Sequence, residues 1–377
     1  MCWEEGGQAR QARWRSESGA PPPRRVAVAD DRMPAEVAYR LACEGTSLLW
    51  RGDFHGARQL LGAMTRRAAR GPRRSRGARR VAAGPAEAFH LHRQEQGRRA
   101  RVLGMLLVPL DADWSVPLRR APDVRRACTE AYGPADGPSL VSLRELLGVV
   151  GAHEWRAKGV PVPALGGDRV HPYYGVFSPV RGEYVDLVAR APLPGGRPAL
   201  AYDIGTGTGV LAAVLARRGV GRVVATDQDP RALACARDNL ARLGLADAVE
   251  VVRADLFPAG RAPLVVCNPP WLPARPSSPV ERAVYDPGSG MLRGFLGGLA
   301  AHLAPGGEGW LILSDLAEHL GLRTRAELLG LVDGAGLRVV DRLDTRPVHP
   351  RAADPSDPLH AARAAEVTSL WRLAVHD

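Results

Sequence analysis

Residues 199–209 read ALAYDIGTGTG, and this stretch decides the fold. Its first six residues form a mostly apolar run of strand length. Glycines follow at 205, 207 and 209, and a helix-forming segment begins at once at 211–218. Glycines at such a position let the chain turn tightly and let a ligand approach the helix N-terminus closely. The stretch therefore predicts a strand, a ligand-binding loop and a helix, in that order.

The same alternation continues to the C-terminus. Apolar runs of strand length are followed by amphipathic segments of helical length, which predicts a doubly wound, mostly parallel sheet with helices on both faces. The last two strands have no predicted helix between them, which indicates an antiparallel hairpin at one edge. The expected strands are 199–204, 222–226, 249–254, 263–267, 309–314, 337–343 and 367–373, and the expected helices are 211–218, 230–243, 292–303 and 325–332.

Carboxylates stand at the ends of the first three strands. Asp203 precedes the glycines and suits a ligand that carries an ammonium group. Asp227 comes 20 residues after Gly207, the place of a carboxylate that accepts hydrogen bonds from ribose hydroxyls. Asp255 ends the third strand, where it can face an adenine amino group. Any one of them could be a helix cap, but three at successive strand ends predict a nucleoside-containing cofactor.

This constellation resembles the cofactor motifs of class I S-adenosylmethionine (SAM) methyltransferases. A nicotinamide dehydrogenase is disfavoured, because its Gly-x-Gly-x-x-Gly fingerprint places the third glycine one residue later. The resemblance implies a Rossmann-like, seven-stranded class I methyltransferase sheet and SAM as the cofactor. It also implies the cofactor-binding residues, which are Asp203, Gly205, Thr206, Gly207, Gly209, Asp227, Asp255 and Leu256.

The fourth strand ends in Asn268-Pro269-Pro270-Trp271, which contains one of the chain's two asparagines. This tetrad resembles the acceptor motif of methyltransferases that modify a planar NH2 group. The nitrogen of such a group is a poor nucleophile because its lone pair is delocalised. The Asn268 side-chain oxygen and the Pro269 carbonyl can each accept one N–H and free the lone pair, while the prolines hold both acceptors in place. Trp271 offers a flat face for the acceptor group and electrons that favour the nearby sulfonium.

Two further segments bear on the acceptor. Residues 174–183, YGVFSPVRGE, and 285–292, YDPGSGML, are similar to segments of the release-factor glutamine methyltransferase (HemK-type) family. This resemblance covers residues 172–377 and implies a macromolecular substrate, first of all a glutamine side-chain amide of a translation-related protein. An adenine N6 in rRNA, tRNA or DNA remains the second hypothesis. A non-catalytic RNA- or ribosome-binding module is the third.

The positive charge lies in the N-terminal part. Residues 1–170 hold 29 basic and 18 acidic residues, whereas residues 171–377 hold 22 of each. The densest stretch is Arg66 to Arg80, with eight arginines in fifteen residues. Its charge suits contact with RNA or a ribosomal surface, although a solvated linker in an Arg-rich chain would look the same.

The sequence predicts three regions. Residues 1–32 are polar and Pro-rich, which indicates a disordered tail or a mis-assigned extension ahead of a true start at Met33. Residues 33–165 predict a basic, mostly helical accessory region, with helices within 37–64, 98–110 and 142–155 and an Arg-rich linker at 66–80. Residues 166–377 are the expected methyltransferase domain.

Several classes are excluded by composition. The five cysteines form no Cys-x-x-Cys pair, which argues against a disulfide framework or a zinc site and favours a cytoplasmic location. His90 and His92 have no apparent third ligand, so no metal is expected. The chain has no apolar run long enough for a membrane span and no apolar N-terminal core of the kind that signal peptides have.

Overall fold

The computed structural model describes residues 1–70, 82–180, 182–277, 280–348 and 354–376. Backbone contacts divide the chain into two units: residues 1–82 with 90–154, and residues 83–89 with 155–377. The sequence-based boundary after residue 165 therefore falls inside the second unit. Within the described ranges, no helix is both long and apolar enough to cross a membrane.

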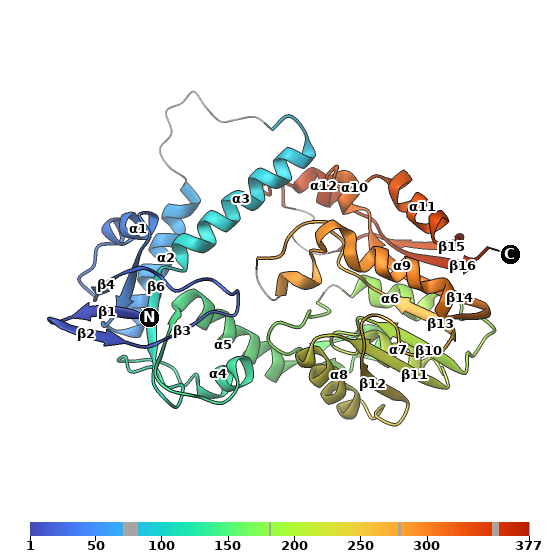
Figure 1. Ribbon diagram of the computed structural model, residues 1–377, viewed down its shortest axis with the longest axis horizontal. Helices are drawn as coiled ribbons and strands as arrows, with labels where there is room; N and C mark the ends of the chain where they lie inside the picture. Colours follow the sequence, from blue (N-terminus) through green and yellow to red (C-terminus); the bar gives the residue numbers. More distant parts are fainter. Residues whose placement is uncertain (71–81, 181, 278–279, 349–353, 377) are drawn as a thin grey trace. The chain divides into compact units, whose positions relative to one another are not determined.

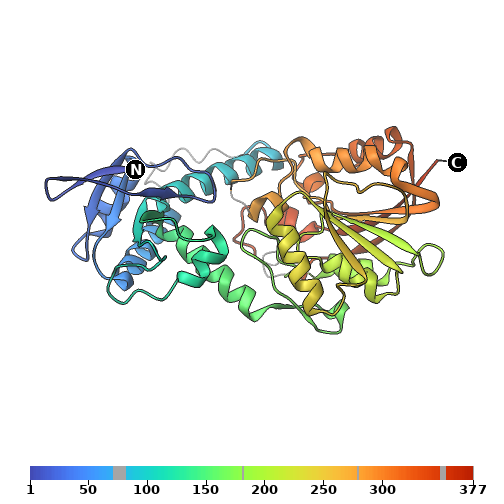
Figure 2. The same ribbon diagram turned by 60° about the horizontal axis from the view of Figure 1, so that its bottom comes forward.

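The second unit is built on a seven-stranded sheet in the order β12-β11-β10-β13-β14-β16-β15. The strands from β12 to β14 run parallel, whereas β16 is antiparallel to both of its neighbours. Figure 2 shows these strands side by side. Their bounds are β10 (Leu200–Ile204), β11 (Arg222–Asp227), β12 (Val249–Arg253), β13 (Ala262–Cys267), β14 (Leu303–Ser314), β15 (Leu337–Thr345) and β16 (Thr368–Val375).

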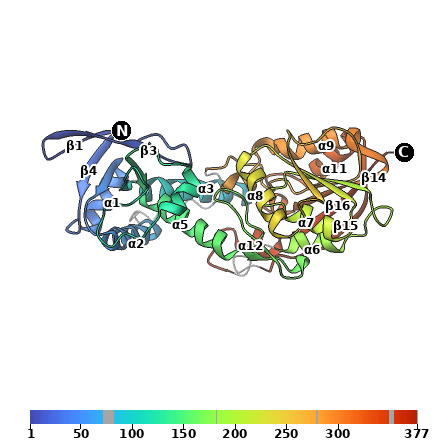
Figure 3. The same cartoon turned by 90° about the horizontal axis from the view of Figure 1, so that it is seen from below.

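Helices cover both faces of this sheet. Figure 3 shows α9 and α11 on one face and α6 and α7 on the other. The helix α12, between β15 and β16, was not expected from the sequence. The bounds are α6 (Glu183–Arg190), α7 (Val210–Arg217), α8 (Pro230–Arg242), α9 (Gly290–His302), α10 (Leu316–His319), α11 (Arg325–Gly334) and α12 (His360–Ala365), with the short elements β8 (Val160–Pro161), η1 (Pro163–Leu165), β9 (Arg169–Val170), η2 (Val280–Ala283) and η3 (Pro287–Ser289).

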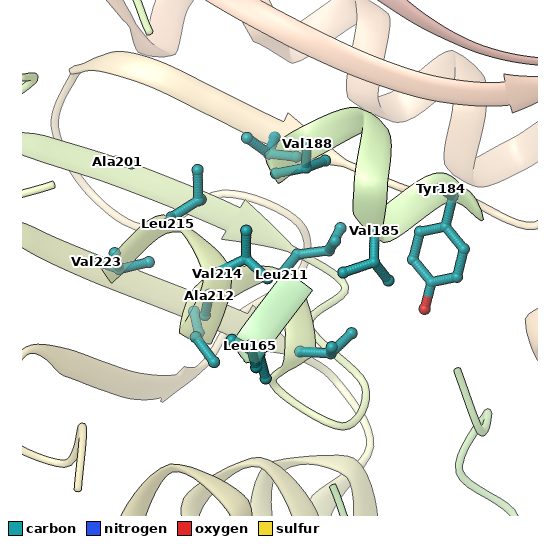
Figure 4. Close-up of a cluster of buried hydrophobic side chains, with 14 of the residues drawn as sticks. Leu165, Tyr184, Val185, Val188, Ala201, Leu211, Ala212, Val214, Leu215 and Val223 are labelled. Carbon is teal, nitrogen blue, oxygen red and sulfur yellow. The ribbon is translucent and has the colours of Figure 1, made fainter. Parts of the chain in front are cut away.

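Two hydrophobic clusters lie on opposite faces of the sheet. Successive side chains of a strand point to opposite faces, so Ala201 of β10 packs under α6 and α7, while Tyr202 packs under α9 and α11. Figure 4 shows Val185 of α6 beside Leu211 of α7 in the first cluster. The double burial explains why these strands read as continuous apolar runs.

The first unit corrects the prediction of a mostly helical region. It holds a five-stranded sheet in the order β3-β7-β6-β5-β4 and a hairpin of β1 and β2, with helices beside the strands (Figure 1). The bounds are β1 (Cys2–Glu5), β2 (Gln8–Gln11), β3 (Arg13–Arg15), β4 (Arg25–Ala29), α1 (Ala35–Cys43), β5 (Thr46–Trp50), α2 (Phe54–Arg70), α3 (Pro85–Leu103), β6 (Leu106–Leu110), α4 (Arg125–Tyr132), β7 (Ser139–Ser142) and α5 (Leu143–Lys158).

The strands of this unit were missed for a physical reason. The central strands β5 and β6 are runs of five residues that are almost entirely buried, and such short apolar runs show neither helical nor alternating periodicity. Residues 1–32, expected as a tail, contribute β1 to β4. These strands are folded because they pair with segments later in the chain: β3 pairs with β7, and β4 pairs with β5.

Candidate active site

The glycine loop lies between β10 and α7, where the sequence predicted it. Gly205, Gly207 and Gly209 have φ values of +72°, +55° and +81°, a region that favours glycine. Two of them also have close neighbours that a side chain would meet. A Cβ on Gly209 would stand 3.3 Å from Ala236 of α8, and a Cβ on Gly205 would stand 2.6 Å from the Met291 methyl group.

Asp203 lies beneath this loop and is 1% exposed. Its Oδ2 accepts hydrogen bonds from the Thr206 hydroxyl at 2.6 Å and from the Ala212 backbone N–H in the first turn of α7 at 3.1 Å. Asp203 therefore ties the strand, the loop and the helix together. Burial, with a contribution from the charge of Asp227, raises the pKa of Asp203 to about 6.

Asp227 reaches the loop from the next strand. Its Oδ2 accepts a hydrogen bond from the Gly207 N–H at 3.1 Å, and its Oδ1 accepts one from the Asp229 N–H at 3.0 Å. Burial raises the pKa of Asp227 as well. Thr206 is fixed from the same strand, because its N–H donates to the Thr226 carbonyl at 2.8 Å. Two carboxylates thus meet at one glycine loop.

Asp255 and Leu256 follow β12, on the far side of Asp227. The Asp255 carboxylate is exposed and accepts a hydrogen bond from the Gln228 side chain. Leu256 has a φ of +64°, and its carbonyl accepts a hydrogen bond from the Thr226 hydroxyl at 2.6 Å. The chain therefore turns sharply here, and Asp255 faces the same edge of the sheet as Asp227.

The acceptor loop begins directly after β13. Cys267 and Pro269 are buried, and Asn268 and Trp271 are half-buried. The Trp271 indole N–H donates a hydrogen bond to Asn268 Oδ1 at 2.9 Å. The Trp271 ring packs against the hydrophobic clusters of both faces. The tetrad is therefore a defined turn whose first and last side chains contact each other.

The two loops meet through sheet register and through Met291. Strands β10 and β13 are parallel neighbours, with Ile204 opposite Cys267, so both loops start at the same edge. The Asp286 carboxylate accepts hydrogen bonds from the N–H groups of Met291 and Leu292 at the start of α9. This cap holds Met291 against Gly205.

Asn239 was not predicted as a site residue, although the chain has only two asparagines. It is 1% exposed on α8. Its Oδ1 accepts a hydrogen bond from the His171 N–H at 2.7 Å, and its Nδ2 donates to the Thr208 carbonyl at 3.0 Å. Asn239 thus joins the segment before the first strand to the glycine loop, and the rarity of asparagine was the signal that could have found it.

Two other expectations concern the N-terminal part. Most of the Arg66 to Arg80 run lies outside the described residues, which resume at residue 82. His90 and His92 lie on α3. Across the part of the chain that the structure describes, no group of three His, Cys, Asp or Glu side chains could hold a metal ion.

Part of the chain is similar in sequence to known methyltransferases. Residues 187–319 match the family model of the methyltransferase small domain. The ribosomal protein L11 methyltransferase of Pelotomaculum thermopropionicum is 39% identical over 162 residues, which are 41% of this chain and 42% of that protein. The release factor glutamine methyltransferase of Cereibacter sphaeroides is 35% identical over 159 residues, 38% of this chain and 55% of that protein. The chain spans about half the length of these curated relatives.

A methyltransferase of known structure from Pyrococcus furiosus aligns over 61% of this chain and 98% of its own, with a TM-score of 0.40 and 17% sequence identity. The glycine loop, the carboxylates at strand ends and the acceptor tetrad all lie inside the segment that the family model matches. Residues 187–319 of this chain are thus similar to the methyltransferase small domain.

Proposed function

We propose that the second unit is a SAM-dependent N-methyltransferase whose acceptor is a glutamine side-chain amide in a translation-related protein. One observation carries the proposal. The glycine loop and the Asn268 tetrad begin side by side, on adjacent parallel strands with Ile204 opposite Cys267. Ligands of open α/β sheets bind at this carboxyl edge, so a cofactor on one loop would meet an acceptor on the other.

The residues of the glycine loop fit SAM. When bound, SAM supplies a methyl group on a positively charged sulfur. Asp203 and Asp227 form an electronegative centre that suits a cationic ligand, and a raised pKa beside a second carboxylate marks such a centre. The loop surface is open at Gly207, where an added Cβ would meet no atom within 4 Å. Asp227 would hold the ribose, and Asp255 with Leu256 would lie at the adenine.

Asp203 has a narrower role than its position in the sequence suggested. Its Oδ2 is already engaged by Thr206 and Ala212. Its charge would favour the methionine ammonium from beneath the loop, and any direct contact would use the other carboxylate oxygen.

The acceptor tetrad would activate a planar NH2 group. Asn268 Oδ1 has two lone pairs, of which one receives the Trp271 indole N–H. The second lone pair and the Pro269 carbonyl would each accept one N–H of the acceptor. The nitrogen then becomes more tetrahedral and its lone pair can attack the methyl group in line. In such a transfer the N–C bond would form as the S–C bond broke, the sulfur would leave as a neutral thioether, and the extra proton on the alkylated nitrogen would pass to water.

A protein acceptor is favoured by the relatives, since a release factor glutamine methyltransferase and a ribosomal protein L11 methyltransferase are among them. The second candidate, an adenine N6 in RNA or DNA, is favoured by the excess of basic residues in residues 1–170 and by the Arg66 to Arg80 run. A duplex base would have to flip out of its stack to reach Trp271. A non-catalytic RNA- or ribosome-binding module would need no Asn268.

Methyl transfer into a lysate tests the proposal. Tritiated SAM and the full chain are added to a lysate of cells that lack this gene, and the labelled material is divided among nuclease, protease and mock treatments. Label that survives nucleases and falls with protease supports glutamine methylation, and the labelled band identifies the target. Label that is lost on nuclease treatment would instead identify a nucleic acid as the methyl acceptor and favour adenine N6. The Asn268→Ala variant is the matched control, and label that does not depend on Asn268 would contradict the assigned site.

A further inference from the structure

The first turn of α3 belongs to the second unit, although the helix then continues into the first. This turn is specified locally. Pro85 occupies the first helical position, where its missing N–H costs no hydrogen bond. The Ala83 N–H donates to the Glu87 carboxylate at 2.6 Å, and the Ala88 N–H donates to the Gly84 carbonyl at 3.0 Å. The sequence around residue 85 thus fixes where the helix begins.

Phe89 follows this turn on α3, and its side chain is buried in the second unit with 2% exposure. Its ring lies 6.5 Å from the Tyr285 ring, at an interplanar angle of 50°, and Leu272 belongs to the same cluster. The turn also touches the end of α10, because a Cβ on Gly321 would stand 3.7 Å from both Pro85 and Ala86. The other buried members of the cluster are Leu316, Ala317, Leu320 and Leu359.

Leu272 and Tyr285 form the base of the acceptor loop. Leu272 follows Trp271 directly and bridges to Tyr285. The Leu272 N–H donates to the Val284 carbonyl at 3.1 Å, and the Asp286 N–H donates to the Leu272 carbonyl at 2.8 Å. Phe89 therefore contacts one partner of this bridge, Tyr285, and shares a hydrophobic cluster with the other, Leu272. The cluster is separate from the two clusters that hold the sheet and its helices together.

We infer that Phe89 is a positioning residue of the acceptor loop. Its ring fixes the bridge between Leu272 and Tyr285, and this bridge fixes where Trp271 and Asn268 stand. The inference rests on the proposed function for its catalytic meaning. The ring contact with Tyr285 joins residues that are 196 positions apart in the chain. A small misplacement of an acceptor group lowers a transfer rate strongly, so the contact would act on the rate of methyl transfer rather than on cofactor binding.

Hydrogen exchange measured by mass spectrometry on the full chain tests the contact without any methyl acceptor. In Phe89→Ala, amide exchange in the peptides that contain Leu272, Tyr285 and Asp286 should rise about tenfold or more, while peptides within 200–215 keep their rates. Phe89→Leu restores apolar volume and should restore protection. Val188→Ala, a buried truncation in the cluster beneath α6 and α7, is the matched control and should spare the acceptor loop.

The kinetic arm measures initial rates with the acceptor that the lysate assay identifies. Phe89→Ala should lower kcat at least tenfold with an unchanged KM for SAM, and Phe89→Leu should recover most of the rate. Acceptor-loop exchange that stays unchanged in Phe89→Ala, or rises equally across the whole second unit, overturns the inference. Failure of methyl transfer in the wild-type chain would count against the proposed function alone, because the exchange result does not depend on it.

Discussion

The Trp271 indole N–H lies 2.9 Å from Asn268 Oδ1 and donates a hydrogen bond to it. This contact selects one of the two orientations of the Asn268 amide, the one in which Oδ1 faces Trp271 and Nδ2 faces away. The proposed mechanism requires the Asn268 amide to accept and not to donate, and so requires this orientation. In the proposed mechanism, Trp271 would then do what a phenylalanine could not: its N–H would hold the amide in place and leave one lone pair of Oδ1 for the methyl acceptor.

Trp271→Phe separates the hydrogen bond to Asn268 from the stacking of the aromatic ring on the methyl acceptor. The variant keeps an aromatic face but loses the indole N–H, so the Asn268 amide can turn. The rate of methyl transfer should fall about tenfold, the effect of one lost hydrogen bond, while SAM affinity stays unchanged by calorimetry. A variant with the wild-type rate would show that stacking alone accounts for Trp271.

Asn268→Ala removes the side-chain oxygen that would accept a hydrogen bond from the methylated NH2 group. We expect unchanged SAM binding and a loss of roughly 10²–10³ in kcat, the usual cost of one pre-organised polar contact in a transition state. Single-turnover rates with bound SAM measure this directly. Equal losses in SAM affinity and in rate would instead place Asn268 in the cofactor site.

Asp227→Ala tests the cofactor site. The substitution removes the carboxylate that is expected to hold the ribose, and it leaves the Gly207 and Asp229 N–H groups without their acceptor. SAM binding should become undetectable by calorimetry. Asp344→Ala, on the outer strand β15, is the control with an equal change of charge. Wild-type affinity in Asp227→Ala would refute the cofactor assignment.

The elements around the candidate site were predictable from the sequence to the extent that their signals are local. The strand before Gly205, the helix after it and the carboxylates at strand ends are each specified within about ten residues, and the structure has them there. Contacts between distant residues were not predictable. Met291 against Gly205, Asn239 between His171 and Thr208, and Phe89 against Tyr285 all depend on how loops return to the sheet edge.

SAM binding should depend on pH through Asp203. Its pKa is raised from 3.8 to about 6 in the folded chain. As pH falls through 6, Asp203 becomes neutral and attracts a cationic ligand less, so SAM affinity should decrease. The stability of the ligand-free protein responds in the opposite direction. The folded state binds more protons than the unfolded state between pH 4 and 6, so this group's contribution to stability falls as pH rises through that window.

Thermal unfolding with and without SAM, at pH 5 and pH 7.5, measures both effects. The stabilisation by SAM should be smaller at pH 5, and Asp203→Asn should remove most of this difference. A SAM-induced shift in Tm that is equal at both pH values in the wild-type chain would contradict an ionised Asp203 at the cofactor.

Arg323 should be a source of instability. It is 7% exposed, and among the described residues its Nε and Nη2 have no hydrogen-bond acceptor although both are buried. The carboxylate of Glu318 pairs with Arg325 at 2.7 Å, and that of Asp286 accepts the N–H groups of Met291 and Leu292. Burial lowers the pKa of Arg323, and the nearby charges of Glu318, Asp286 and Glu327 offset only part of this effect.

Arg323→Met keeps much of the side-chain length and removes the unsatisfied donors. The free energy of unfolding should rise by roughly 1–3 kcal/mol, the usual cost of buried polar groups without partners. Arg325→Met is the matched control, because it breaks the pair with Glu318 and should leave stability unchanged or lower it. Chemical denaturation of all three proteins decides the point. A less stable Arg323→Met would mean that the guanidinium finds a partner in solution, and the search would then turn to which group supplies it.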